Sequence, residues 1–348
     1  MGGVEIHVEE ISKRLVRNGF DVDVLTVDNT GSLSNEIIRD GVKIKRFKGC
    51  RPCGLNDVFY FSADLDLYLK KNSSDYDIIH AQNYHAFPAF YASQNICKNK
   101  FVFTPHYHGA GSYFVRNLLH IPYKFLGGKI FENAEIVFCV SDYERNLVLS
   151  NFGVDNDKIR IVPNGFDFDD FTGNKLRNKS NTNILYVGRL EKYKGIHYIF
   201  EAFPSLDDEV NIEIVGIGPY ENELKKLATR LGIEDRVNFY HSISRDRLLK
   251  KYSESGLFVL LSIRESYGIT VGESLLSGTP CLVLNSSALR EWVDNKNCFG
   301  IDYPVNVKRL AIMISKIIGT TVDYEEVKNK VLSWDDVTKK IIETYAAI

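Results

Sequence analysis

The sequence predicts an α/β protein with two doubly wound domains, each built on a parallel sheet with helices on both faces. Strand-like apolar runs alternate with amphipathic helical runs along the chain, a pattern typical of parallel sheets with crossover helices. The alternation pauses at the polar segment 172–182, which has the composition of a linker. The length of 348 residues also suits two domains better than one.

The predicted strands are short runs rich in branched aliphatic and aromatic residues. They occupy residues 21–27, 42–47, 76–81, 101–106 and 135–141 in the first half, and residues 183–188, 211–216, 236–241, 257–262 and 280–285 in the second. The final segment, 334–348, predicts a helix, because its acidic residues suit a first turn and Val337, Ile341 and Tyr345 form an apolar stripe.

Composition and charge exclude several classes of protein. The net charge is −2 and the sequence pI is about 6.5, so no global basic field favours nucleic acid. No apolar run approaches the roughly 18 residues that a membrane-spanning helix needs. The acidic start MGGVEIHVEE is unlike a signal peptide. The cytoplasm is therefore the expected compartment.

The cysteines predict neither a disulfide framework nor a metal site. Six cysteines are scattered along the chain. Cys50 and Cys53 have the C-x-x-C spacing of a redox or zinc site, but no second pair of ligands follows at metal-binding distance. We expect no cofactor and no metal. Packing in the core or in loops is the simplest role for the other four, Cys97, Cys139, Cys281 and Cys298.

Three loops at predicted helix starts could bind a phosphate group. Gly2 and Gly3 precede an amphipathic helix, so their backbone could approach a phosphate closely. Arg189 and Lys194 follow a strand at a spacing that could place both cations on one diphosphate, although a solvated charged loop explains them equally well. The segment RESYG, residues 264–268, leads from a buried strand into a helix whose first turn presents unpaired N–H groups.

The third loop also carries two glutamates, Glu265 and Glu273, eight positions apart. On a continuous helix this spacing separates two side chains by roughly 80°, so the carboxylates share no common face. The close pair of carboxyl groups that retaining glycoside hydrolases use as nucleophile and acid is therefore not predicted.

Nine segments occur together in the order and spacing of a known family. They are GGVEIHVEE, IIHAQN, FTPHYHG, SDYERNLV, IRIVPNGFD, YVGRLEKYKG, IVGIGP, RESYGITVGESLLSGTP and SWDDVTKKIIETY. In them the chain resembles the GT-B glycosyltransferases of family GT4 over nearly its whole length. The most specific element is the E-x7-E signature, here Glu265 and Glu273. The resemblance implies two Rossmann-like domains with an interdomain cleft.

The resemblance also implies an activity and a domain plan. Family members transfer a sugar from a nucleotide-sugar to an acceptor with retention at the anomeric carbon, and they need no metal. Residues 1–171 would form an acceptor-side domain, 172–182 the linker, and 183–333 the nucleotide-sugar domain. Residues 334–348 would cross back to the first domain. UDP- and GDP-sugars fit as donors, and a glycan or a lipid-linked molecule fits as acceptor.

The donor site implied by the resemblance lies mostly in the second domain. Glu273 would accept hydrogen bonds from the ribose hydroxyls, and Glu265 would face the sugar. Arg189 and Lys194 would neutralise the charge that grows on the leaving diphosphate. The N–H groups that would cap this diphosphate belong to Gly268, Ile269 and Thr270.

The first domain would contribute Gly3 and a histidine near the transferred sugar. His106 matches the family histidine, with a loop-capping histidine as the alternative reading. His108 lies close enough in sequence to be confused with it, and His80 is expected to be structural.

Two departures from the family pattern bear on activity. Relatives begin with a buried strand before the glycine loop, whereas Met1 directly precedes Gly2 here. We therefore expect the first strand of the N-terminal sheet to be absent, either because the start is truncated or because the sheet has one strand fewer, and both stability and activity depend on this strand. Relatives also commonly carry an acidic residue at the position of Ile217.

Other functions also fit the sequence. A catalytically silent nucleotide-sugar-binding protein and a nucleotide-sugar epimerase both fit the fold. A dinucleotide site at 215–221 is disfavoured, because Glu221 stands where the third glycine of G-x-G-x-x-G belongs. The basic segment 39–51 and the aromatic, basic segment 113–131 could rest on an anionic membrane, or could be an edge strand and a core helix.

Overall fold

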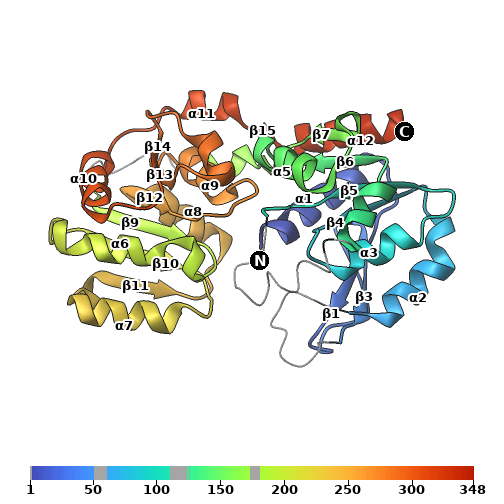
Figure 1. Cartoon of the computed structure of the whole chain (residues 1–348), viewed down its shortest axis with the longest axis horizontal. Helices are drawn as coiled ribbons and strands as arrows, with labels where there is room; N and C mark the ends of the chain where they lie inside the picture. The colour runs from blue at the N-terminus through green and yellow to red at the C-terminus, as the bar shows by residue number, and fades with distance from the viewer. Residues whose placement is uncertain (1, 51–60, 110–123, 125, 173–180) are drawn as a thin grey trace. The chain divides into compact units, whose positions relative to one another are not determined.

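The computed structural model describes residues 2–50, 61–109, 124, 126–172 and 181–348 (Figure 1). The chain forms two compact units. Unit 1 comprises residues 1–165 and 334–348, and unit 2 comprises residues 166–333. The boundary therefore precedes the expected linker, because Phe166 and Phe171 are buried in the core of unit 2. Most of that linker, residues 173–180, lies outside the described residues.

Unit 2 is built on a six-stranded sheet in the order β11-β10-β9-β12-β13-β14, and every neighbouring pair is parallel. Its strands are β9 (Asn183–Val187), β10 (Asn211–Val215), β11 (Val237–Tyr240), β12 (Leu257–Leu260), β13 (Cys281–Leu284) and β14 (Cys298–Ile301). In chain order this is 3-2-1-4-5-6, the doubly wound dinucleotide-fold arrangement. The strand order reverses between β9 and β12.

Two layers of helices accompany this sheet. The α-helices are α6 (Ile196–Ala202), α7 (Glu221–Leu231), α8 (Arg245–Glu254), α9 (Ile269–Leu276), α10 (Val307–Ile317) and α11 (Tyr324–Lys330), and the 3₁₀ turns are η3 (Phe168–Phe171), η4 (Lys192–Lys194), η5 (Phe203–Ser205), η6 (Glu234–Arg236) and η7 (Ser287–Trp292). Helix α6 contacts α7 and α10, whereas α9 contacts α8 and α11. Side chains of Ser244, Asn306 and Asp323 cap the starts of α8, α10 and α11.

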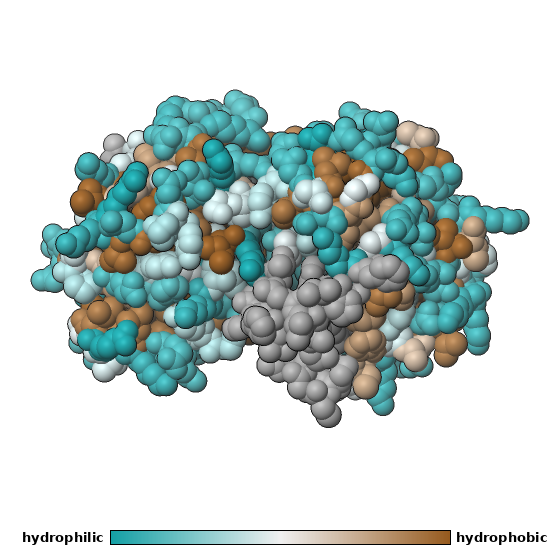
Figure 2. Space-filling model, viewed as in Figure 1, coloured by the Kyte–Doolittle hydropathy of each residue, from teal (hydrophilic) through white to brown (hydrophobic). Residues whose placement is uncertain are grey.

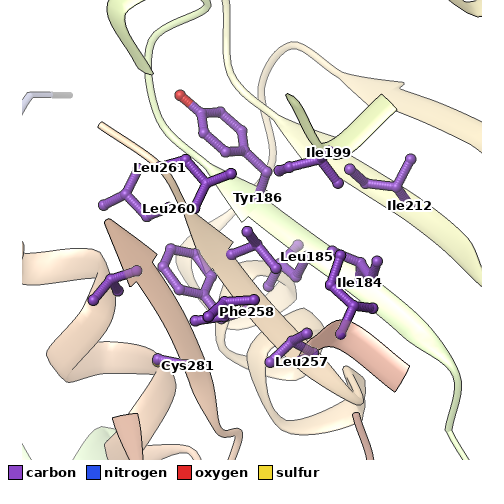
Figure 3. Close-up of a cluster of buried hydrophobic side chains, with 14 of the residues drawn as sticks. Ile184, Leu185, Tyr186, Ile199, Ile212, Leu257, Phe258, Leu260, Leu261 and Cys281 are labelled. Carbon is purple, nitrogen blue, oxygen red and sulfur yellow. The ribbon is translucent and has the colours of Figure 1, made fainter. Parts of the chain in front are cut away.

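The core of unit 2 lies between the sheet and these helices. All four residues of β12 and of β13 are buried, as expected for central parallel strands covered on both faces. Figure 3 shows Leu257 and Phe258 of β12 beside Ile184 and Leu185 of β9. Burial of apolar side chains at about 25 cal/mol per Å² is the main stabilising term for such a layer.

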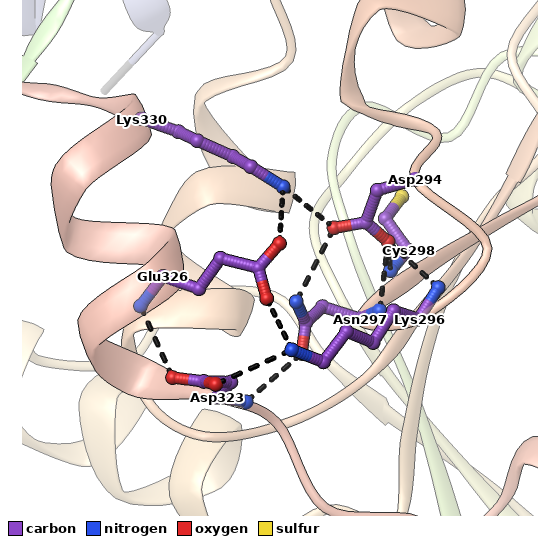
Figure 4. A network of polar contacts seen from close by, with 7 residues as sticks. All are labelled: Asp294, Lys296, Asn297, Cys298, Asp323, Glu326 and Lys330. Atoms are coloured by element: carbon purple, nitrogen blue, oxygen red, sulfur yellow. Dashed lines mark hydrogen bonds and ion pairs between the residues drawn. The ribbon is translucent and has the colours of Figure 1, made fainter.

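A polar network ties the start of β14 to helix α11 (Figure 4). One carboxylate oxygen of Asp294 accepts the backbone N–H groups of Lys296, Asn297 and Cys298 at 2.7–2.9 Å. Its other oxygen accepts from Lys330 at 3.1 Å. Burial alone would raise the pKa of Asp294, but these donors outweigh it and hold the pKa well below its ordinary value. The turn before β14 is thus fixed by an ionised side chain.

The strands of unit 1 fall into two sheets, in the orders β1-β3-β2 and β4-β5-β6-β7. They are β1 (Asp23–Asp28), β2 (Glu36–Arg39), β3 (Val42–Lys48), β4 (Ile78–Gln82), β5 (Lys100–Thr104), β6 (Ile136–Cys139) and β7 (Ile159–Ile161). Strand β2 is antiparallel to β3, and the other pairs are parallel. Among the described residues no strand precedes the first helix. A single continuous sheet, as a doubly wound domain would have, is not formed by these strands.

The helices of unit 1 include the C-terminal one. Among the described residues of this unit they are α1 (Gly3–Arg17), α2 (Ala63–Asn72), α3 (Phe87–Gln94), α5 (Asp142–Phe152) and α12 (Trp334–Ala347), with 3₁₀ turns η1 (Ser73–Asp75) and η2 (Asn156–Lys158). Helix α12 packs on α1, where Arg14 Nε donates to Asp335 Oδ1 at 2.6 Å. The chain passes between units near β8 (Gly165–Phe166) and β15 (Leu332–Ser333). The C-terminal helix thus crosses back to the first unit.

Candidate active site

Two loops meet at the point where the strand order of unit 2 reverses. The first follows β9 and includes η4, and the second follows β12 and leads into α9. The Ile263 N–H donates to the Tyr193 carbonyl at 3.1 Å. Gly195 has a φ of +75°, and a Cβ there would lie 2.4 Å from the Leu261 carbonyl oxygen. Only glycine permits this approach. In open α/β sheets ligands bind at this point, beyond the carboxyl ends of the strands.

The two loops bring Lys194 and Glu265 together. Lys194 Nζ lies 2.6 Å from Glu265 Oε1, and their side chains are 13% and 17% exposed. Burial alone would lower the pKa of Lys194, but the adjacent Glu265 carboxylate raises it above its ordinary value. Lys194 is therefore a protonated cation at neutral pH. The sequence predicted both residues at the site but did not predict their ion pair.

Arg189 lies on the same loop with a more exposed side chain. Its guanidinium Nη2 is 3.4 Å from Glu191 Oε1, and its side chain is 59% exposed. Its carbonyl oxygen accepts from the buried Tyr186 hydroxyl at 2.8 Å. The backbone is therefore anchored while the cation reaches solvent.

Ile217, on the loop after β10, is 61% exposed, and its carbonyl accepts the Leu190 N–H at 2.9 Å.

Helix α9 begins at the predicted anion-binding residues. Gly268 is its N-cap with a φ of +95°, and Ile269 and Thr270 form its first turn. A Cβ on Gly268 would lie 2.9 Å from Leu289 Cδ2. The Trp292 indole N–H donates to the Tyr267 carbonyl at 2.7 Å. First-turn N–H groups have no acceptor within their own helix, so this start is suited to bind an anion.

Glu273 lies on α9 and is 5% exposed. The Tyr252 hydroxyl donates to its Oε2 at 2.9 Å, and Arg245 donates to its Oε1. Arg245 also pairs with Asp170 at 3.0 Å. Each carboxylate oxygen keeps a second lone pair, so Glu273 is held in place and can accept further hydrogen bonds. Arg245 and Tyr252 were not predicted from the sequence, and Ser244, which caps α8, was the only nearby signal.

Unit 1 contains the other two predicted residues. Gly3 is the first residue of α1. His106 follows β5, is 7% exposed and has a φ of +48°. Its Nε2 lies 3.0 Å from Gln82 Oε1, so Nε2 carries the proton. A non-glycine residue at positive φ costs about 1 kcal/mol or more and often marks a functional site.

His106 belongs to a buried histidine cluster in unit 1. Its ring packs edge-on against His7 at 4.8 Å between centroids, and the Gln82 amide links it to His80 at 3.1 Å. His80 Nδ1 lies 2.6 Å from the Tyr345 hydroxyl of α12. Burial lowers the pKa of His7 to about 4 and that of His80 to about 3, and it lowers the pKa of His106 as well. The cluster is therefore neutral at pH 7.

Acid should destabilise unit 1 through this cluster. The pKa of His7 in the folded protein lies below the ordinary value of 6.5, so the unfolded chain binds more protons than the folded protein between pH 4 and 6.5. The folded protein therefore becomes less stable as the pH is lowered through that window. We expect this effect to cost about 2 kcal/mol of unfolding free energy at pH 5 relative to pH 7. Urea unfolding at both pH values should show a smaller difference in the variant His7→Asn. An equal loss in both proteins would contradict this assignment.

Comparison with known families identifies the chain. Residues 1–170 match Glycosyltransferase Family 4, and residues 167–330 match Glycosyl transferases group 1. The chain belongs to the GT4 family of GT-B glycosyltransferases. The fold and family expected from the sequence are therefore confirmed.

Relatives of this glycosyltransferase align along nearly its whole length. It is 26% identical to an uncharacterized glycosyltransferase of Methanocaldococcus jannaschii, over 99% of this chain and 94% of the relative. It is 22% identical to the D-inositol 3-phosphate glycosyltransferase of Corynebacterium urealyticum, over 100% of this chain and 91% of that one.

Solved structures share the fold of this glycosyltransferase. The sucrose-phosphate synthase of Thermosynechococcus elongatus superposes with a TM-score of 0.81 at 19% identity, covering 99% of this chain and 93% of that one. Anabaena HepE in complex with UDP-glucose superposes with a TM-score of 0.77 at 20% identity, covering 100% and 97%.

The structure bears on the predictions about metal binding, membrane spans and cysteines. Among the described residues, no group of three His, Cys, Asp or Glu side chains could hold a metal ion, and no helix there is long and apolar enough to cross a membrane. Cys53 and most of segment 113–131 lie outside the described residues. Cys50 is exposed, whereas Cys139, Cys281 and Cys298 are buried as predicted. Cys97 is also exposed, so only loop packing remains for it.

Proposed function

We propose that this glycosyltransferase transfers a hexosyl group from a nucleotide-sugar to a glycan or lipid-linked acceptor, with retention at the anomeric carbon. The observation that carries the proposal is the cluster at the sheet reversal of unit 2. There a partly buried lysine–glutamate pair, Lys194 and Glu265, accompanies the start of α9 and the anchored Glu273. These features offer an anion site and two carboxylates for hydroxyl groups.

In the proposed complex each feature holds one part of the donor. The first-turn N–H groups of Gly268, Ile269 and Thr270 bind the diphosphate, and Arg189 and Lys194 neutralise its charge. The carboxylate of Glu273 accepts the ribose hydroxyls, while Arg245 and Tyr252 keep it oriented. Glu265 faces the sugar.

The proposed chemistry needs no second carboxylate as nucleophile. The bond between the anomeric carbon and the diphosphate oxygen breaks, and the charge that develops on that oxygen is stabilised by Lys194 and the α9 start. The acceptor hydroxyl attacks the same face of the oxocarbenium-like sugar, and its proton passes to the donor phosphate. Retention follows because attack and departure occur on one face.

The acceptor side of the proposal includes an anionic membrane surface as the place where a lipid-linked acceptor is met. Three basic residues of segment 39–51 pair with acids: Arg39 with Glu9, Lys43 with Glu36, and Lys45 with Asp23. These ion pairs reduce the charge available to an anionic lipid surface. On the face drawn in Figure 2, hydrophobic residues form small patches among hydrophilic ones. A peripheral role at the membrane is testable by sedimentation with anionic vesicles at low and high salt.

The proposal is tested by incubating the chain with UDP-glucose, UDP-N-acetylglucosamine and GDP-mannose, each with a panel of sugar and glycolipid acceptors. We expect one donor to raise the melting temperature of the protein and to be consumed in the reaction. NMR of the product should show that the anomeric configuration of the donor is retained. Binding without consumption would support a silent nucleotide-sugar-binding protein instead. Formation of an epimeric nucleotide-sugar would support an epimerase.

Metal independence is a separate prediction. The proposed cations at the diphosphate are Lys194 and Arg189, which do not depend on an added ion. We therefore expect the rate of sugar transfer to stay about the same when roughly 10 mM EDTA is added to remove trace metal ions. Loss of activity in EDTA that a divalent ion restores would overturn this part of the proposal.

A further inference from the structure

Unit 1 contains a buried carboxyl group, that of Glu144, which has no role in the proposed mechanism. Glu144, on the first turn of α5, is 0% exposed. Its Oε2 accepts the backbone N–H of Val140 at 2.6 Å, and its Oε1 accepts the backbone N–H of Tyr107. It therefore joins three segments of unit 1: the start of α5, the end of β6 and the loop after β5.

The local sequence explains only part of this arrangement. Ser141 caps α5, accepting the Glu144 N–H at 3.0 Å, and Ser141 to Glu144 has the S-x-x-E spacing of a capping box. In a capping box the glutamate would bond to the N–H of the cap residue itself. Here its bond to Tyr107 spans 37 residues, so the side chain does more than end a helix.

The bond to Tyr107 fixes the backbone directly after His106. His106 has a φ of +48°, a conformation that persists only when its surroundings hold it. On one side of the strained residue, its own ring bonds to Gln82 at 3.0 Å. On the other side, the next N–H bonds to Glu144. Loss of the second contact would free the loop to relax toward negative φ and move the imidazole.

Both oxygens of Glu144 accept a backbone N–H, and the ionised carboxylate is the stronger acceptor at both positions. Burial raises the pKa of Glu144 to about 8, against the opposing effect of the two N–H donors. The surrounding groups are Tyr107, Cys139 of β6, and Tyr143 and Arg145 of α5. Burial raises the pKa of Tyr107 to about 12 and that of Cys139 as well, so neither titrates with Glu144.

We propose that Glu144 is a positioning residue for sugar transfer: it holds the Tyr107 backbone N–H and thereby fixes the conformation of the His106 imidazole. The effect of Glu144 on catalysis presupposes the proposed function, because it requires that the protein transfers a sugar. The geometric part, that Glu144 sets the conformation of His106, stands on the contacts alone.

The variant Glu144→Gln tests this with the volume unchanged. An amide has one acceptor oxygen, so one of the two backbone N–H groups loses its partner. We expect kcat for transfer to fall by about 10- to 100-fold, since small misplacements at a reacting centre have effects of this size. Nucleotide diphosphate affinity, measured by calorimetry, should change less than about twofold because that site lies in unit 2. Asp142→Asn is the matched control, on the same turn with a 65% exposed side chain.

A second measurement needs no enzymatic activity. In the intact protein with ¹⁵N-labelled tyrosine and histidine, the Tyr107 amide signal, assigned with Tyr107→Phe, should shift with an apparent pKa near 8. The His106 imidazole signals should follow the same curve and should move in Glu144→Gln but not in Asp142→Asn. If the wild-type chain transfers no sugar from any donor, the proposed function fails while these signals still decide the role of Glu144. His106 imidazole signals that are unchanged in Glu144→Gln, or a folded Glu144→Gln protein with full activity, would overturn the inference.

Discussion

Replacing Lys194 by alanine should lower kcat for sugar transfer by about 10²- to 10³-fold, the effect of removing one preorganised group that stabilises a developing negative charge. Lys194 is 13% exposed and lies 2.6 Å from Glu265, and a water molecule that took its place would supply no positive charge. The donor KM should change less than kcat, because the charge on the leaving oxygen grows only as the bond breaks.

Two further variants separate catalysis from stability in this experiment. Lys194→Ala leaves the Glu265 carboxylate without its cation, which is itself destabilising. The double variant Lys194→Ala/Glu265→Gln removes that unpaired charge, so it should regain melting temperature without regaining transfer. Lys192→Ala, an exposed lysine in the same turn, is the control and should behave as wild type. Full turnover in Lys194→Ala would remove this lysine from the mechanism.

Replacing Glu273 by glutamine should raise the donor KM by about 10²-fold while kcat changes little. The proposed ribose contacts exist both before and during the reaction, so their loss weakens ground state and transition state alike. Hydrogen bonds to a charged group contribute about 1.5–3 kcal/mol each, and one such bond accounts for this factor. The substitution also removes the charge that faces Arg245.

The matched control for Glu273 is Glu254→Gln on α8. Glu254 has a 60% exposed side chain and a single loose contact with Lys250 at 3.6 Å, so donor KM and melting temperature should stay unchanged. Isothermal titration with UDP and GDP would measure nucleotide affinity directly in both variants. An unaltered nucleotide affinity in Glu273→Gln would place the ribose elsewhere.

The sequence predicted the sheet of unit 2 and its ligand-binding edge because each strand is a self-contained apolar run. Strands β9 to β13 all lie where such runs were found. Strand β14 was missed, since Cys298–Ile301 is short and includes Gly300. The β2–β3 hairpin was also missed, although Asp40-Gly41 between two apolar runs is a hairpin signal. Both of its turn residues have positive φ.

The partners of the site residues could not be predicted, because they come from distant segments. Glu273 pairs with Arg245, 28 positions away, and Glu144 bonds to the backbone of Tyr107. Nothing in a sequence pattern specifies such contacts before the topology is known.

The burial of His7 could not be predicted for the same reason. In the helix α1 it is one polar residue among several, yet it is 1% exposed because the Trp334 ring of α12 packs 5.7 Å from it.

The most direct test of the proposed site is hydrogen–deuterium exchange with and without UDP-glucose, UDP-N-acetylglucosamine and GDP-mannose. This measurement locates the donor without knowledge of the acceptor. With the donor that binds, the account predicts slower amide exchange in the loop after β9, residues 188–195, and from Ser262 through the first turn of α9. In Glu273→Gln this protection should require a higher donor concentration. Protection confined to other parts of unit 2, such as β14 and α11, with unchanged exchange in both loops would contradict it.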